Sequence, residues 1–239
     1  MFFGGNTMTL CILLTVIGAA ILCWYVAEKI KKYSTKAVIL KSLVSTLFMA
    51  VAVAAAFSGS VSPYSGFVIL GLLFGLLGDI WLDQKFVYPD EDTVYTYAGF
   101  CVFGVGHILF MTGMLLHYAD CSRTVYIILP LVIGAVIGLG AVLGGPMLKL
   151  DFGKFKTISI VYGFLLGSMA AMAGSLAIMH GWQSTTLNLM FIGGVSFLLS
   201  DLVLSGTYFG GKERPVDIIL NYLFYYGAQF LIAWSLLYV

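Results

Sequence analysis

Eight runs of apolar residues divide this chain, and short polar segments separate them. The runs lie at 8–27, 37–57, 66–83, 95–117, 124–143, 156–179, 186–206 and 217–238. Each is long enough to cross the hydrocarbon core of a bilayer, about 30 Å thick, as one helix. None of the connecting segments is long enough to form a separate domain. The pattern predicts an all-α fold, a polytopic membrane bundle of about eight transmembrane helices in a single domain, 1–239.

The composition agrees with this prediction. The chain is 61% apolar and 10% charged, with a mean hydropathy of +1.02, which excludes an ordinary soluble domain. A net charge of +1 gives no indication of nucleic-acid binding. The first apolar run has no basic segment before it and no cleavage pattern after it, so we expect a retained span. Four cysteines show no metal-binding or pairing pattern, and we expect them to be small apolar side chains: Cys11, Cys23, Cys101 and Cys121.

The basic residues predict an orientation. Arg123 stands alone in one set of alternate connections, and the positive-inside rule then places 28–36, 84–94, 144–155 and 207–216 in the cytoplasm with both termini outside. We expect a bacterial plasma membrane, with an endoplasmic reticulum membrane as the alternative. The first run ends in Trp24 and Tyr25, which we expect in the aromatic belt at the cytoplasmic interface. The basic residues on the cytoplasmic side are Lys29, Lys31, Lys32, Lys36, Lys41, Lys85, Lys149, Lys154, Lys156, Lys212 and Arg214.

Two aspartates lie deep within apolar runs, Asp79 in the third and Asp201 in the seventh. In both runs a glycine precedes the aspartate by eight residues, and a small residue, Gly78 or Ser200, stands directly before it. A carboxylate inside a membrane helix is costly and marks a functional site by default. We therefore predict one site built from both aspartates. Asp83, one turn beyond Asp79, is expected at the membrane interface.

The two aspartates also indicate an internal repeat. They lie 122 residues apart, His107 follows Asp79 by 28 residues, and Gln229 follows Asp201 by the same interval. Four spans return the chain to the side from which it started, so the repeat is parallel and both aspartates lie near the same face. The predicted halves are approximately 1–120 and 121–239.

Other polar residues within the runs are candidates for binding or orienting a substrate. Lys41 lies about one turn inside its run, where it either extends to the interface or pairs with a carboxylate or a lipid phosphate. His107 is expected mid-membrane, as a helix–helix hydrogen-bonding residue or as a functional one. Tyr222, Tyr226 and Gln229 share one helix face. The full set is Lys41, His107, Tyr162, Ser200, Tyr222, Tyr225, Tyr226 and Gln229.

Two carboxyl groups in an apolar pocket suit acid–base catalysis. Burial favours the neutral form of each, and repulsion between two charges leaves one protonated and one ionised, which gives a general acid and a general base. The chain has no zinc motif, nucleophile elbow or phosphate-binding loop, and no cofactor is expected. A metal site formed by His107 and the two aspartates is the alternative. A site among membrane helices near an interface favours a lipid substrate.

Five motifs in order resemble the YhhN family of integral membrane proteins, which includes lysoplasmalogenases. They begin at Lys41-Ser42, Gly78-Asp79, Gly106-His107, Gly194 (through Asp201) and Tyr225-Tyr226 (through Gln229), and they cover nearly the whole chain. The resemblance implies hydrolysis of the vinyl ether bond of lysoplasmalogens to a fatty aldehyde and glycerophosphoethanolamine or glycerophosphocholine. It implies that the two aspartates handle protons. Lys41 would then hold the phosphate, and Tyr162, Tyr222, Tyr226, Gln229 and His107 would orient water or the glycerol hydroxyl.

Two other functional classes remain open. Paired intramembrane aspartates within a repeat also fit a proton-coupled transporter of a lipid or small amphiphile. Such carriers favour a midplane site and helices broken by proline, whereas both aspartates lie near one face in runs without proline. A non-catalytic lipid-binding or scaffold protein would have little use for two costly acids.

Overall fold

Every predicted span is a helix in the structure, a computed structural model that describes residues 4–31, 34–58, 62–120, 122–211 and 214–239. Short 3₁₀ segments lie in the connections and at the end of the described chain: η1 (Pro89–Glu91), η2 (Gly145–Leu148), η3 (Gly153–Phe155) and η4 (Leu236–Tyr238). The helices are α1 (Gly4–Lys31), α2 (Thr35–Ser58), α3 (Pro63–Val87), α4 (Asp92–Tyr118), α5 (Val125–Leu143), α6 (Lys156–Met179), α7 (Thr185–Gly210) and α8 (Pro215–Ser235).

Most of the helices extend a few residues beyond the apolar runs, and at α3 and α7 a serine satisfies a free backbone group of the first turn. Ser62 caps α3 in a reciprocal capping box with Ser65, and Pro63 occupies the first turn. Ser184 caps α7 by accepting a hydrogen bond from the backbone N–H of Leu187. All eight helices are long and apolar enough to cross a bilayer. The chain is therefore an integral, multi-pass membrane protein.

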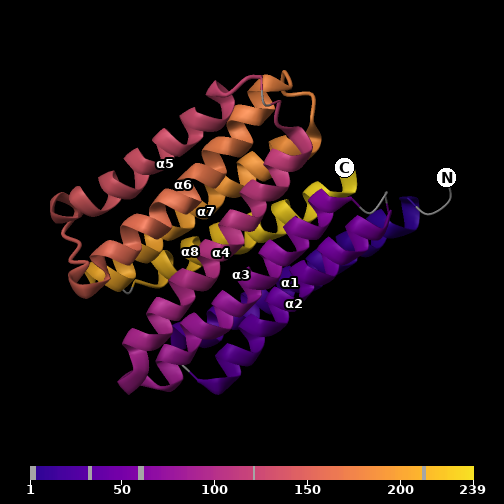
Figure 1. The fold of residues 1–239 in the computed structure, drawn as a ribbon. Helices are drawn as coiled ribbons and strands as arrows, with labels where there is room; N and C mark the ends of the chain where they lie inside the picture. Colours follow the sequence, from indigo (N-terminus) through magenta and orange to yellow (C-terminus); the bar gives the residue numbers. More distant parts are fainter. Residues whose placement is uncertain (1–3, 32–33, 59–61, 121, 212–213) are drawn as a thin grey trace.

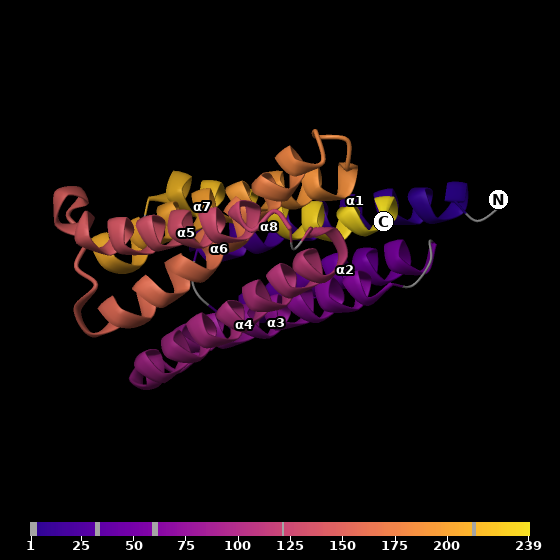
Figure 2. The same ribbon diagram turned by 45° about the horizontal axis from the view of Figure 1, so that its top comes forward.

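The bundle is assembled from four antiparallel hairpins, α1–α2, α3–α4, α5–α6 and α7–α8. Figure 1 shows α5, α6 and α7 along one side, α1, α2 and α3 along the other, and α4 and α8 between them. Figure 2, after rotation, shows α2, α3 and α4 in one layer and α5, α6, α7 and α8 in another. Across the centre, α4 packs against α6 and α2 packs against α8. The second helix of each predicted half thus contacts the fourth helix of the other half.

The packing of α3 on α4 recurs in the packing of α7 on α8. A Cβ on Gly71 would overlap the ring of Phe110, and a Cβ on Gly193 would lie 2.9 Å from Ile232 Cγ1. Gly193 and Ile232 each lie 122 residues after their counterparts, the interval that separates the two aspartates. A repeat of two halves requires such corresponding contacts. The division into halves itself stays a prediction.

The described basic residues other than Arg123 gather at one end of the bundle, called here the lysine-rich end. Lys29 at the end of α1 contacts Tyr222 at the start of α8, and Lys85 at the end of α3 lies over the ring of Tyr208 in α7. Arg123 belongs to the connection between α4 and α5 at the opposite end. The side of the membrane that each end faces stays a prediction. Lys32, Lys212 and Cys121 lie outside the described residues, whereas Cys11, Cys23 and Cys101 are free thiols.

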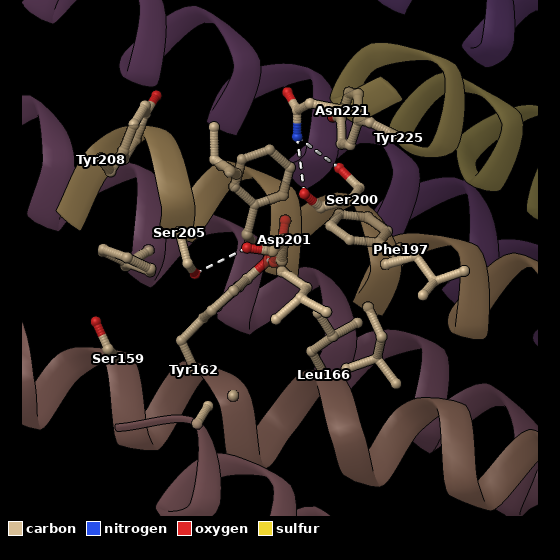
Figure 3. Close-up of a pocket in the computed structure, with 18 of the residues that line it drawn as sticks. Ser159, Tyr162, Leu166, Phe197, Ser200, Asp201, Ser205, Tyr208, Asn221 and Tyr225 are labelled. Atoms are coloured by element: carbon tan, nitrogen blue, oxygen red, sulfur yellow. Dashed lines mark hydrogen bonds between the residues drawn. The ribbon is translucent and has the colours of Figure 1, made fainter. Parts of the chain in front are cut away.

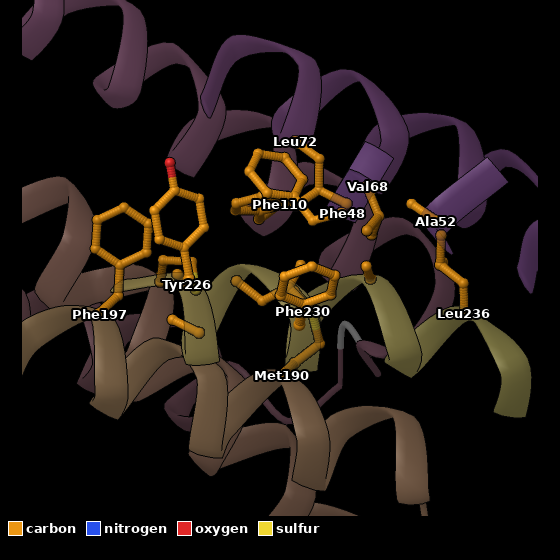
Figure 4. Packing of buried hydrophobic residues seen from close by; sticks show 14 of the residues in the cluster. Phe48, Ala52, Val68, Leu72, Phe110, Met190, Phe197, Tyr226, Phe230 and Leu236 are labelled. Carbon is orange, nitrogen blue, oxygen red and sulfur yellow. The ribbon is translucent and has the colours of Figure 1, made fainter. Parts of the chain in front are cut away.

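A packed apolar core extends through the bundle and continues away from the lysine-rich end. Figure 4 shows side chains from α2, α3, α4, α7 and α8 meeting there. The ring of Phe48 lies 6.4 Å from those of Tyr226 and Phe230, and Phe110 is buried beside them. Aromatic rings at such separations fill space and fix the rotation of each helix.

Glycines bring α5 into close contact with α6, which predicts a strong effect of one added methyl group. A Cβ on Gly138 would lie 2.6 Å from the backbone oxygen of Ile160 and the backbone nitrogen of Phe164. Because backbone atoms cannot move aside alone, Gly138→Ala should separate the helices and lower the melting temperature of the purified protein by several degrees. Gly140→Ala is the matched control, since a Cβ there meets nothing within 4 Å and alanine favours helix. Equal melting temperatures for the two variants would contradict this account of the α5–α6 contact.

Candidate active site

A cavity of about 470 Å³ lies inside the lysine-rich half of the bundle. Side chains from α2 to α8 line it, and most of them are apolar (Figure 3). Leu148, Leu150 and Phe152, from the connection between α5 and α6, also line it. His107, Tyr226 and Gln229 are not part of the lining. The candidate residues that line the cavity are Lys41, Asp79, Tyr162, Ser200, Asp201, Tyr222 and Tyr225.

Asp79 is surrounded by donors. Its Oδ2 accepts hydrogen bonds from Ser45 Oγ at 2.6 Å and from Tyr225 Oη at 2.8 Å. Its Oδ1 lies 3.2 Å from Lys41 Nζ. The side chain is only 2% exposed. Two hydroxyl donors and a cation stabilise the ionised form of a carboxyl group, so this environment suits a carboxylate.

Lys41 also pairs with a second carboxylate, that of Asp83. Its Nζ lies 2.9 Å from Asp83 Oδ1, and both side chains are buried. Asp83 occupies the same helix face as Asp79, one turn further on, and is buried within the bundle; its depth in the membrane stays a prediction. Tyr25 donates a hydrogen bond to Asp83 at 3.3 Å and is fully buried, so it is not in the interfacial aromatic belt. The sequence left open whether Lys41 extends to the interface or pairs with a carboxylate or a lipid phosphate. In the structure it pairs with two carboxylates.

Asp201 has a different environment. Its Oδ2 accepts a hydrogen bond from Tyr162 Oη at 2.6 Å, and its backbone oxygen accepts one from Ser205 Oγ. Figure 3 shows Tyr162 extending from α6 toward Asp201 on α7. In the part of the chain that the structure describes, no basic side chain forms an ion pair with Asp201. A carboxyl group in an apolar cavity with one hydroxyl donor and no cation is suited to carry a proton.

The two aspartates share the cavity but do not share a hydrogen bond. Each contacts a side chain from the second helix of its own predicted half, Lys41 from α2 for Asp79 and Tyr162 from α6 for Asp201. The two carboxyl groups are thus distinguished by unlike partners rather than by direct contact with each other. This arrangement resembles the general pattern in which one environment favours an acid and another favours a base.

Three further candidates form hydrogen bonds with side chains around the cavity. Gln229 Nε2 donates to Tyr225 Oη at 3.0 Å, which orients the hydroxyl that binds Asp79. Tyr226 Oη lies 3.2 Å from Ser45 Oγ. Ser200 accepts from Asn221 Nδ2 at 2.9 Å through both its hydroxyl and its backbone oxygen (Figure 3). These bonds hold α8 against α2 and α7 around the cavity.

His107 lies outside the cavity, packed among aromatic rings. Its ring centroid is 5.0 Å from Phe197 and 5.6 Å from Tyr162, and it is 1% exposed. Neither ring nitrogen has a hydrogen-bond partner in the described structure. The described residues contain no group of three His, Cys, Asp or Glu side chains placed to hold a metal ion. The alternative of His107 and both aspartates as ligands of one metal does not match this geometry.

We compared the sequence of the chain with models of known protein families. The model of the YhhN family matches residues 36–236, a range that includes both aspartates and every candidate residue. The chain belongs to the YhhN family. No curated protein and no solved structure matches the chain.

Within this YhhN protein, four residues around the two aspartates were not among the candidates chosen from the sequence. Ser45 follows Lys41 by four residues and Asp83 follows Asp79 by four, so helical spacing alone places each on a candidate face. Asn221 stands beside Tyr222 at the start of a polar helix. For Tyr25 we find no signal in the sequence, because only the packing of α1 against α8 brings it to Asp83.

Proposed function

We propose that this protein is an intramembrane hydrolase that cleaves the vinyl ether bond of lysoplasmalogens. The products would be a fatty aldehyde and glycerophosphoethanolamine or glycerophosphocholine. The observation that carries the proposal is the pair of aspartates with unlike partners in one apolar cavity. Membership of the YhhN family, which includes lysoplasmalogenases, supports the same reaction.

The walls of the cavity support a substrate with an aliphatic chain. Leu199 and Leu202 line it from α7 and are also 41% and 59% exposed on the surface that lipid covers. Phe100, Phe103 and Leu166 continue the apolar lining toward Asp79 and Asp201. An amphiphile from the adjacent leaflet can thus keep its chain in apolar surroundings while its polar end reaches the carboxyl groups.

The unlike partners assign a role to each aspartate. Asp201, with one hydroxyl donor and no described cation, is the general acid. Asp79, with Ser45, Tyr225 and Lys41 as donors, is the carboxylate that acts as general base and stabilises positive charge. Tyr162 and Tyr225 hold the two carboxyl groups in position.

The reaction balances with these two groups and one water molecule. The acid proton of Asp201 adds to the β-carbon of the vinyl ether, and an oxocarbenium ion forms. Water attacks the cationic carbon and gives a proton to Asp79, which produces a hemiacetal. Asp79 then returns that proton to the glycerol oxygen as the carbon–oxygen bond breaks. The hemiacetal hydroxyl proton passes to Asp201, the aldehyde leaves, and both aspartates regain their starting states.

Aldehyde release from lysoplasmenylethanolamine by the purified protein in detergent tests the proposal. We expect aldehyde from this lipid and no fatty acid from ester-linked lysophosphatidylethanolamine, because the ester lacks the alkene carbon that accepts the proton. Folded protein that releases no aldehyde would contradict the proposal. The transporter alternative would then be tested by proton-coupled flux in liposomes, although α3 and α7 run unbroken past their aspartates.

A further inference from the structure

A second, smaller pocket lies at the lysine-rich end, where the two aspartate-bearing helices terminate. Its volume is about 300 Å³. Two residues from the last turns of α3, two from the last turns of α7, one from the connection between α3 and α4 and the first residue of α4 form its lining. These are Lys85, Phe86, Thr207, Tyr208, Pro89 and Asp92. Both acid-bearing helices therefore contribute side chains to this pocket as well as to the main cavity.

Tyr208 belongs to the linings of both pockets. It follows Asp201 by seven residues, which places it on the same face of α7 about 10 Å further along the helix axis. Lys85 follows Asp79 by six residues, a similar distance along α3 in the same direction. The second pocket therefore continues the site from the carboxyl groups toward the membrane interface. An extended glycerophosphoethanolamine group has a comparable length.

The polar groups of the second pocket carry both signs of charge. Lys85 Nζ lies 3.7 Å from Asp92 Oδ1 and 3.3 Å from the ring centroid of Tyr208. The side chain of Lys85 is 9% exposed and that of Asp92 is 49% exposed. The Lys85–Asp92 contact is long for an ion pair, and the ring face of Tyr208, which Lys85 Nζ covers in this structure, attracts a cation. A ligand that carries a phosphate and an ammonium group has a group of suitable charge for Lys85, for Asp92 and for the ring of Tyr208.

We infer that this pocket binds the zwitterionic headgroup of a lysophospholipid. The phosphate pairs with Lys85, and the ammonium group contacts Asp92 and the ring of Tyr208. The inference rests on the proposed function for the identity of the lipid, and it names the residues that select the headgroup. It also separates the roles of the two lysines, because Lys41 is held by Asp79 and Asp83 while Lys85 meets the phosphate.

Binding of uncleavable ether analogues tests the inference without any turnover. The probes are 1-O-alkylglycerol and its phosphate, phosphoethanolamine and phosphocholine derivatives, titrated into the detergent-solubilised protein. Lys85→Gln should weaken binding of the three phosphate-bearing probes about tenfold relative to alkylglycerol, and Lys85→Arg should restore most of it. Asp92→Asn should weaken the two ammonium-bearing probes relative to the alkyl phosphate. Lys36→Gln and Asp90→Asn are the matched controls, since both residues lie outside the two pockets.

The outcomes separate this inference from the proposed reaction. Equal affinities of Lys85→Gln and the wild type for every probe would overturn the headgroup pocket, and so would an equal loss for alkylglycerol and its phosphate. Competition by inorganic phosphate alone, as strong as that of the alkyl phosphate, would indicate a free anion site and would also overturn it. Headgroup-dependent binding without aldehyde release would contradict the reaction and leave the pocket standing.

Discussion

Asp201→Asn should abolish turnover while the protein still binds its lipid. The amide keeps the shape of the side chain and the contact with Tyr162, but it has no acidic proton to give to the alkene carbon. Loss of a general acid typically costs about 10²- to 10⁴-fold in rate, and we expect aldehyde release to fall by at least the lower figure. The measurement is aldehyde formed per unit time from lysoplasmenylethanolamine, with affinity for the uncleavable 1-O-alkyl analogue measured in parallel.

The matched control for this prediction is Asp90→Asn, which alters an exposed aspartate outside the cavity. Its rate should equal that of the wild type. A loss of turnover with unchanged analogue binding identifies a group that acts in the transition state rather than in binding. Near-normal turnover in Asp201→Asn would contradict the role of the residue as the acid. The same loss in Asp90→Asn would show that the assay reports folding instead.

Lys41→Met should destabilise the protein strongly because it removes the cation from two buried carboxylates. Lys41 Nζ lies 3.2 Å from Asp79 and 2.9 Å from Asp83, and these side chains are at most 6% exposed. Removing one partner from a buried ion pair costs about 3–5 kcal/mol, which corresponds to a fall in melting temperature on the order of 10 °C. Thermal unfolding in detergent, followed by loss of monodisperse protein, measures the change.

The double variant Lys41→Met/Asp83→Asn distinguishes lost charge balance from lost packing. It removes one of the two carboxylates left without a cation, so it should recover most of the lost stability. Lys36→Met is the control, since that lysine pairs with Glu28 at the surface and its side chain is 52% exposed. A surface pair contributes at most about 1 kcal/mol. Equal destabilisation by Lys41→Met and Lys36→Met, or no recovery in the double variant, would contradict the buried network.

The sequence predicted the helices correctly because they follow from one-dimensional information, and the same information gave an expected depth for each functional group. An apolar run of about 20 residues has few alternatives to a membrane helix, and a rise of 1.5 Å per residue gives the depth of each side chain. Asp79 and Asp201 were therefore expected near one face, and the structure has both in one cavity. Membership of the YhhN family, predicted from five short motifs, is confirmed by the family match.

The contacts between helices could not be predicted in the same way, because a sequence does not specify which neighbour a helix face meets. Asp83 was not expected to have a buried partner, but packing of α2 against α3 brings Lys41 Nζ to its carboxylate. His107 was a candidate for orienting the substrate, yet the rotation of α4 places it among Phe110, Phe197 and Tyr162, outside the cavity lining. The second pocket depends on Tyr208 and Lys85 meeting from different helices, which no local pattern indicates.

The most direct test of the proposed reaction is hydrolysis in D₂O. If the proton from Asp201 adds to the β-carbon of the vinyl ether, the aldehyde must carry one solvent deuterium on the carbon next to its carbonyl. Rapid reduction of the aldehyde to the alcohol fixes the label before it can exchange, and mass spectrometry locates it. The account predicts one deuterium at that carbon in product formed by the wild-type protein. Aldehyde without deuterium at that carbon, or no aldehyde from folded protein, would contradict it.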